Sequence, residues 1–410
     1  MINGANTGFM LLAAALVMIM TPGLAFFYGG LVGRSNTLTI MIQSFASMGI
    51  TTVMWWLVGY SLCFSGGNDG IFGNFHYALL RHVGVNSIYQ PSHIPLSVLI
   101  VYQMMFAIIT PALITGAFTN RVTFKAYLIF LVVWQVAVYY PFVHMLWGGG
   151  LLEHWGARDF AGGIVVHASA GFAALASVLY VGKRKFVDTP HNIPFIALGT
   201  GLLWFGWYGF NAGSELKVDH ITALAFLNTD IAASFAAVTW LFVEWWFAKK
   251  PHFVGLLTGA VAGLATITPA AGYVPIYASV VIGIAAGGVC YAAIQLKNRL
   301  KWDDALDVWG VHGVGGLLGI VLLGVFAGTA VNAAGGAGLI HGSGSFFGKQ
   351  VAAGIGCSLY AFLFTYAALR VIDLITAVRV GEEAESGLDE AMHGESAYQL
   401  DDGAPPVPAM

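Results

Sequence analysis

The sequence predicts an all-α polytopic membrane protein with eleven transmembrane helices, and two observations predict it. Of the 410 residues, 58% are hydrophobic and only 9% are charged, whereas soluble domains carry about 25% charged residues. The apolar residues also gather in runs of about 20 or more, the length that a helix needs to cross a bilayer. We therefore expect lipid, rather than water, to surround most of the chain.

The predicted spans follow one another from the N-terminus. Their approximate ranges are 7–31, 38–63, 96–118, 124–146, 160–182, 192–212, 221–247, 253–270, 274–296, 306–331 and 349–373. The segment from Gly381 to Met410 is polar and acidic. We predict a transmembrane domain over 1–380 and a cytoplasmic regulatory tail over 381–410.

The distribution of Lys and Arg predicts the orientation. With the N-terminus outside, the inside segments hold thirteen of these residues and the outside segments hold four, Arg81, Arg158, Lys217 and Lys349. Cytoplasmic loops carry the excess of positive charge, so the N-terminus is predicted outside and the C-terminus inside. The first apolar run lacks a basic segment before it and is too long for the apolar core of a signal peptide, so no signal peptide is identified, and the start is either a mature terminus or an uncleaved one.

Two short matches predict an internal repeat. Ile109-Thr110-Pro111-Ala112 in the third span matches Ile267-Thr268-Pro269-Ala270 in the eighth, and His167 in the fifth span matches His312 in the tenth. Both offsets are five spans, and an odd offset turns the second copy upside down. We predict inverted repeats over 7–182 and 192–331, with 349–373 as an extra helix. Inverted repeats of this kind are common in transporters.

His167 and His312 are the main candidates for chemistry. Ionisable side chains inside a bilayer are costly and usually face the interior of the helix bundle or a pathway. A purely structural role, with each ring bonded to a backbone carbonyl, is the alternative for either histidine. Metal binding is disfavoured, because neither Asp159 nor Asp307 stands at a chelating i+3 or i+4 spacing from a histidine. Two neutral rings at pseudo-symmetric positions would instead bind a small polar solute.

Asp159, Trp147 and Trp207 form a second group of candidates. Asp159 precedes Phe160-Ala161-Gly162-Gly163 at the start of a helix, where an aspartate caps backbone N–H groups. A direct contact with a cation is the alternative role. Trp147 and Trp207 lie near the outer ends of their spans, either as interfacial anchors or as the aromatic faces of a cation site.

Composition argues against other classes of function. The net charge of −3 provides no basic field for nucleic acid. Cys63, Cys290 and Cys357 stand far apart in apolar stretches and are expected to be core residues rather than a disulfide or metal framework. The intramembrane acidic residues Asp230, Glu244 and Asp373 are placed near the ends of the predicted spans, and no nucleophile–base pair stands out. No enzyme, cofactor or metal is therefore predicted.

The motifs together resemble the ammonium transporters of the Amt/Mep/Rh group, over nearly the whole chain. The matching segments are Thr21–Gly30, Met145–Gly150, Asp159–His167, Gly209–Ser214, Asp307–Gly313 and, in the tail, Gly387–Tyr398. Trp147, Ser214 and the tail motif favour the Amt/Mep branch. Glu215 departs from the family pattern, where a small apolar residue is expected.

The resemblance implies roles for individual residues. Trp147 and Ser214, with Phe106, would form an outer ammonium site, and Asp159 would be the essential aspartate beside it. Phe106 and Phe210 would form a stacked gate, and Trp207 a pore wall above the twin histidines His167 and His312.

The resemblance also implies a function and partners. Ammonium, with methylammonium as an analogue, would bind outside and lose its proton near the gate. Ammonia would then pass the histidines, which are candidates for a proton relay. A homotrimer, a plasma membrane location (a bacterial inner membrane) and a PII-type signalling partner are expected. An ammonium sensor that signals through the tail is the alternative function.

Overall fold

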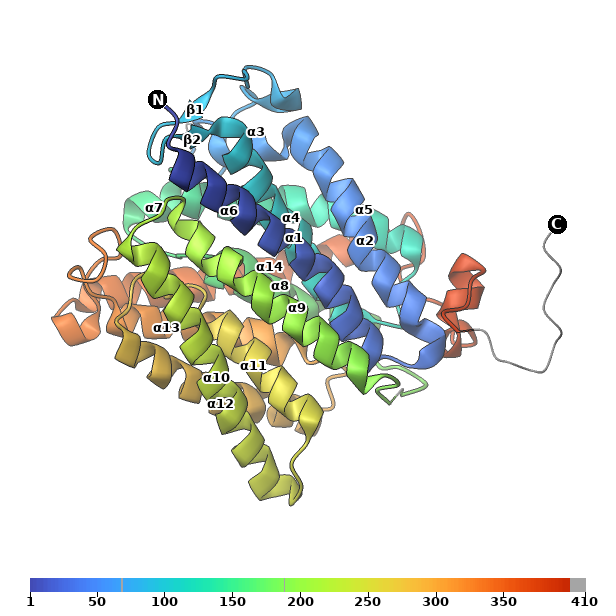
Figure 1. The fold of residues 1–410 in the computed structure, drawn as a ribbon. Helices are drawn as coiled ribbons and strands as arrows, with labels where there is room; N and C mark the ends of the chain where they lie inside the picture. Colours follow the sequence, from blue (N-terminus) through green and yellow to red (C-terminus); the bar gives the residue numbers. More distant parts are fainter. Residues whose placement is uncertain (68, 188, 399–410) are drawn as a thin grey trace, which may run out of the picture.

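The structure is a computed structural model, and it describes residues 1–67, 69–187 and 189–398. Long helices dominate it, as Figure 1 shows. Within the described residues, ten helices are long and apolar enough to cross a membrane. The predicted polytopic helical membrane fold is therefore confirmed at this level.

The elements follow in chain order. They are α1 Gly4–Leu31, α2 Thr37–Met54, η2 Trp55–Gly59, α3 Tyr60–Phe64, β1 Ile88–Tyr89, β2 Ile94–Pro95, α4 Leu96–Phe118, α5 Phe124–Trp134, η4 Gln135–Tyr139, α6 Tyr140–Trp147, α7 Leu151–Trp155, η5 Gly163–Ala168, α8 Ser169–Val181, α9 Ile193–Ala212, η6 Gly213–Glu215, α10 His220–Ala248, α11 Phe253–Ile267, α12 Ile276–Arg299, η7 Trp309–Val314, α13 Gly315–Phe326, α14 Gly344–Asp373 and η10 Asp389–His393. The segments η2, η4, η5, η7 and η10 are π-helical. β1 and β2 form a two-residue antiparallel pair in a loop.

The predicted span over 253–270 corresponds to a shorter helix. α11 has 15 residues and ends at Ile267, so it is about 22 Å long, against a hydrocarbon core of about 30 Å. The helix ends there because Pro269 has no backbone N–H to continue it. The chain then runs through turns to Pro275.

Connections between the helices lie on two opposite faces. On the first face, the N-terminal segment bonds to the loop after α3 through Asn3 N and His93 O, at 2.8 Å. On the second face, which we call the tail face, Val380 N donates to Arg121 O at 2.9 Å. Figure 1 shows the tail beside the ends of α1 and α2, and α1 beside α9.

Two glycines bring the histidine-bearing segments into backbone contact. A Cβ built on Gly171 of α8 would lie 2.0 Å from Gly313 N, and a Cβ on Gly316 of α13 would lie 2.8 Å from His167 Cβ. Each glycine follows its own histidine by four residues and touches the segment that carries the other histidine. Only glycine permits this approach.

We expect Gly171→Ala to destabilise the protein by about 1–3 kcal/mol, because the added methyl group overpacks the crossing. A thermal melt in detergent measures this, and methylammonium uptake should fall with it. Gly201→Ala is the matched control, since a Cβ at Gly201 would meet nothing within 4 Å. Equal melting temperatures for the two variants would contradict the assigned contact.

Candidate functional site

Three cavities follow one another through the bundle. The first, which we call the outer cavity, has a volume of about 260 Å³ and opens toward the face that carries the N-terminal segment. A narrow lumen of about 10 Å³ holds His167 and His312, and an inner cavity of about 290 Å³ opens toward the tail face. Phe27, Val261 and His312 line both the lumen and the inner cavity. The lumen has room for about one water-sized molecule.

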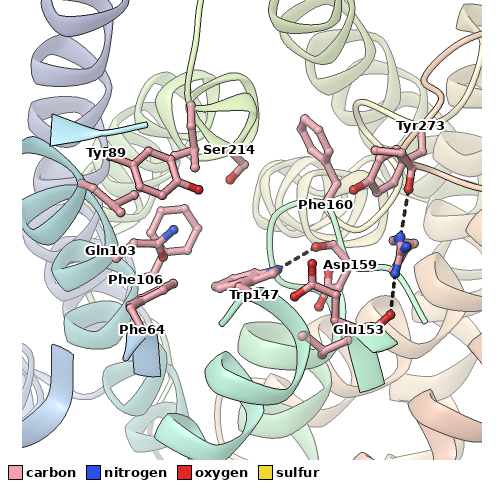
Figure 2. Close-up of a pocket in the computed structure, with 15 residues that line it drawn as sticks. Phe64, Tyr89, Gln103, Phe106, Trp147, Glu153, Asp159, Phe160, Ser214 and Tyr273 are labelled. Atoms are coloured by element: carbon pink, nitrogen blue, oxygen red, sulfur yellow. Dashed lines mark hydrogen bonds between the residues drawn. The ribbon is translucent and has the colours of Figure 1, made fainter. Parts of the chain in front are cut away.

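Trp147, Ser214 and Phe106 line the outer cavity together, as predicted (Figure 2). The indole Nε1 of Trp147 donates to the carbonyl oxygen of Asp159 at 2.7 Å, which fixes the ring. The Ser214 hydroxyl donates to Phe210 O at 2.9 Å and lies 3.3 Å from the Tyr102 hydroxyl, which leaves its oxygen a lone pair to accept a bond from a cation. An aromatic face and a free oxygen acceptor are therefore available at one place.

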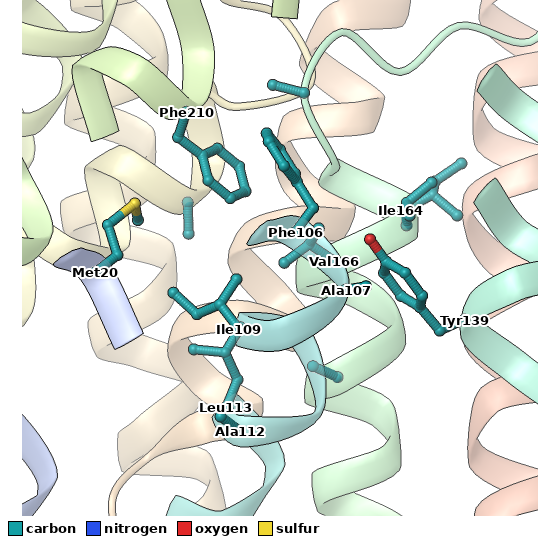
Figure 3. Close-up of a cluster of buried hydrophobic side chains, with 14 of the residues drawn as sticks. Met20, Phe106, Ala107, Ile109, Ala112, Leu113, Tyr139, Ile164, Val166 and Phe210 are labelled. Atoms are coloured by element: carbon teal, nitrogen blue, oxygen red, sulfur yellow. The ribbon is translucent and has the colours of Figure 1, made fainter. Parts of the chain in front are cut away.

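Two phenylalanines separate the outer cavity from the lumen. The rings of Phe106 and Phe210 stack with centroids 4.1 Å apart. Figure 3 shows both rings above Ile109 and Leu113 of α4, which line the lumen. Tyr102, one turn before Phe106, donates to Phe210 O at 2.9 Å and so ties α4 to α9 at this level.

The two histidines face each other in the lumen. Their Nδ1 atoms are 3.2 Å apart, and the rings are nearly parallel, 18° apart. One Nδ1 must therefore donate and the other accept. His167 Nε2 is buried and has no hydrogen-bond partner among the described residues. Trp207 stacks on His167 at 5.3 Å and donates to Thr268 Oγ1 at 2.8 Å, which orients the indole.

Asp159 caps the segment that carries His167. Its carboxylate accepts the N–H groups of four residues, Gly162, Gly163, Ile164 and Val165, at 2.7–3.1 Å. The side chain is 3% exposed and lies at the outer cavity. Both carboxylate oxygens are used by the backbone, which matches the predicted N-cap.

Asp304 makes the corresponding contacts on the tail face. It accepts Val308 N at 3.1 Å and Trp309 N at 2.7 Å, at the start of η7. Asp159 precedes His167 by eight residues, and Asp304 precedes His312 by eight. Asp307, the residue weighed beside His312 from the sequence, instead pairs its carboxylate with Lys297 Nζ at 2.6 Å. The equal spacing was the signal that could have found Asp304.

Burial raises the pKa of Asp304 to about 6, against the opposing charge of Lys297 and with a smaller contribution from Asp307. Protonation removes an acceptor from the cap, so the cap weakens as the pH falls through that value. We expect uptake to fall when the pH on the tail side drops from about 7 to about 5. Proteoliposomes with a buffered tail side measure this. Asp304→Asn should lack that step, and an identical pH profile would contradict the assignment.

A family model described as Ammonium Transporter Family matches residues 8–398. The chain belongs to the ammonium transporter family. The ammonium transporter of Bacillus subtilis (strain 168) is 45% identical over 398 residues, covering 96% of this chain and 98% of that protein. The solved structure of Candida albicans Mep2 matches with a TM-score of 0.88 and 36% identity, covering 93% of this chain and 87% of that chain.

A solved sensor Amt protein is also similar, with a TM-score of 0.86 and 28% identity, covering 95% of this chain and 98% of that chain. These likenesses confirm that the chain belongs to the Amt/Mep branch, as the motifs predicted. They also confirm that it is a multi-pass membrane protein. The relatives named here are transporters or Amt/Mep proteins.

The residues to which the resemblance assigns site or pore roles all line the outer cavity or the lumen of this family member; they are Phe106, Trp147, Asp159, His167, Trp207, Phe210, Ser214 and His312. The structure adds residues that the motifs missed, Tyr102, Gln103, Thr268 and Asp304. Glu215, the departure from the family pattern, pairs with Lys217 Nζ at 3.1 Å. Lys217 also pairs with Asp219 at 3.0 Å, so its positive charge is shared by two carboxylates.

The described part of the tail, 381–398, packs on the tail face. Asp389 accepts the N–H groups of Leu38 and Thr39 at the start of α2, at 3.0 and 2.8 Å. Arg379, just before the tail, donates to Val181 O at the end of α8 and to Glu385. The tail is thus attached to the start of α2 and, through Arg379, to the end of α8, the helix that continues η5 with His167. The remainder of the predicted tail, 399–410, lies outside the described residues.

Proposed function

We propose that this family member conducts ammonia derived from ammonium through the three cavities. The cation binds outside against Trp147, Phe106 and Ser214, through the aromatic faces and the hydroxyl. It loses its proton near the Phe106–Phe210 gate, and ammonia enters the lumen. The observation that carries the proposal is the lumen itself, which is narrow, apolar and lined by two facing histidines.

Selectivity follows from the cost of moving charge. Taking an ammonium-sized ion from water into a medium of low dielectric constant costs on the order of 20 kcal/mol by the idealised Born estimate. Ammonium avoids this cost by releasing a proton, and potassium, of similar size and equal charge, has no proton to release. His167 and His312 then offer neutral ammonia the hydrogen bonds that the apolar wall lacks, and they are candidates to carry the proton.

We also propose that the chain crosses the membrane eleven times, with the N-terminus outside. The segment from Phe253 to Val274 supports this, because α11 supplies Val254 to the inner cavity and the turns that follow it supply Tyr273 to the outer cavity. The inverted repeats over 7–182 and 192–331 are supported by the matched sets Asp159–His167–Gly171 and Asp304–His312–Gly316. The tail over 381–410, a homotrimer and a PII-type partner remain predictions.

Proteoliposomes test the function. We expect saturable uptake of labelled methylammonium and an ammonium-dependent current or internal pH change. Potassium pulses should give neither, at the same protein density. Uptake equal to that of empty liposomes would contradict the proposal, and so would an equal response to potassium.

An ammonium sensor is the second candidate, favoured by the likeness to the sensor Amt protein and by the packing of the tail. Truncation at about residue 380 separates the two functions. A transporter should lose flux on truncation, because the tail holds the start of α2 through Asp389 and braces Arg379, at the end of α8, through Glu385. A pure sensor should show little flux with the tail intact.

A further inference from the structure

One intramembrane carboxylate has no part in the pathway proposed above. Asp230 is the eleventh residue of α10, about 15 Å from the start of that helix. Among the described residues, it is absent from the linings of the outer cavity, the lumen and the inner cavity. A carboxylate inside a membrane span is costly and is expected to have a partner and a purpose.

The partners of Asp230 both come from α9. Its Oδ1 accepts the Tyr208 hydroxyl at 2.6 Å and the Trp204 indole N–H at 3.2 Å. Trp204 and Tyr208 are four residues apart, so they share one face of α9. The Tyr208 ring also stacks on Phe226, with centroids 4.1 Å apart and planes 5° apart. Phe226 precedes Asp230 by one turn of α10, so Tyr208 is held by its ring and by its hydroxyl.

Other faces of the same stretch of α9 meet the pore and α1. Trp207 and Phe210 line the lumen. Toward α1, a Cβ on Gly206 would lie 2.2 Å from Met20 Cγ, and one on Gly209 would lie 2.6 Å from Leu16 Cβ. A glycine surface of this kind permits close approach but makes no directional bond. The contact with α1 therefore leaves the rotation of α9 about its axis to be fixed elsewhere.

We propose that Asp230 is a positioning residue that sets this rotation and thereby holds Trp207 and Phe210 in the lumen. The inference rests on the proposed roles of these two rings as pore wall and gate. Adjacent residues of a helix are about 100° apart around its axis, so a clamp on Trp204 and Tyr208 fixes the direction of Trp207. Asn211 Nδ2 bonds to Thr229 Oγ1 at 2.9 Å and holds α9 separately, one turn nearer Ser214.

The test compares Asp230→Leu, Asp230→Asn and Tyr208→Phe in proteoliposomes, with Leu227→Ala as the matched control on the exposed side of α10. In Asp230→Leu we expect the maximal rate of methylammonium uptake to fall about fivefold, with a measurable leak of potassium. The apparent KM should stay within about twofold, because Trp147 is untouched and Asn211 still holds the end of α9 that leads to Ser214.

Asp230→Asn should restore uptake, since its carbonyl oxygen can accept both bonds. Combining Tyr208→Phe with Asp230→Leu should add nothing to Asp230→Leu, because both changes break the same bond. A purely structural role would lower the amount of folded protein without changing potassium rejection or showing this coupling.

Hydrogen exchange over residues 200–212 provides a readout that does not depend on transport. The clamp predicts faster exchange in Asp230→Leu and unchanged exchange in Leu227→Ala. The proposal would be overturned if Asp230→Leu matched the wild type in all three measurements, namely methylammonium uptake, potassium rejection and hydrogen exchange. If that variant fails to insert, Tyr208→Phe decides, and wild-type behaviour of this variant would overturn it equally. A wild-type protein without uptake would refute the proposed function, while the exchange comparison would still test the clamp.

Discussion

Replacing His167 with alanine is expected to reduce methylammonium uptake by about tenfold to a hundredfold, and replacing both His167 and His312 by more. A neutral solute in the lumen would lose a hydrogen bond whose absence in a buried site costs about 1–3 kcal/mol, and each 1.4 kcal/mol corresponds to a tenfold change in rate. The enlarged lumen would also admit water, so the rejection of potassium should weaken. Uptake and potassium-driven current in the same liposomes measure both effects.

His144→Gln is the matched control for the histidine variants. His144 is buried like His167, with 1% exposure, but its Nδ1 lies 2.9 Å from Cys63 O and it lines none of the three cavities described above. The control should keep wild-type uptake and rejection. Unchanged uptake together with unchanged potassium rejection in the double alanine variant would refute the conduction role of the pair.

Replacing Asp159 with alanine is expected to lower the maximal rate of uptake by about a hundredfold and to lower the melting temperature. Four backbone N–H groups would lose a charged acceptor, and hydrogen bonds to charged groups contribute about 1.5–3 kcal/mol each. Water in the outer cavity can replace only part of them. Uptake kinetics and a thermal melt measure the two consequences.

The same measurements separate the two roles considered for Asp159. A cap predicts that Asp159→Asn also lowers the rate and the melting temperature, because its amide group cannot accept as the second oxygen does. Direct recruitment of the cation predicts a raised apparent KM at wild-type stability. Asp69→Asn, a change in an exposed outer loop, controls for the loss of one negative charge on this face.

Helix positions were predictable because apolar runs and their polar breaks are visible without packing information. The early end of α11 was also visible in principle, in Pro269. The π-helical turns that carry His167 and His312 were not, because every residue around them is apolar or small and the sequence pattern does not report the backbone hydrogen-bond period. The contacts of Gly171 and Gly316 depend on a crossing between segments about 145 residues apart.

The candidate site divides in the same way. Trp147, Ser214 and Phe210 belong to the matching motifs, and the resemblance also assigned a role to Phe106, so the expected positions of all four followed from the resemblance. Tyr102 belongs to no motif, and its role depends on a carbonyl of α9 more than 100 residues later. Asp230 was noticed as an intramembrane charge, but its partners could be found only once α9 and α10 lay side by side.

The two capped segments run in opposite directions through the bundle. η5 and α8 begin beneath Asp159 at the outer cavity, whereas η7 and α13 begin above Asp304 at the tail face. The peptide dipoles of a helix sum to partial charges at its ends, and here the two sets oppose each other along the same axis. The dipoles of these two segments therefore impose no net polarity on the lumen between them. We therefore expect net movement through the lumen to be reversible, with its direction set by the solute and proton gradients across the membrane.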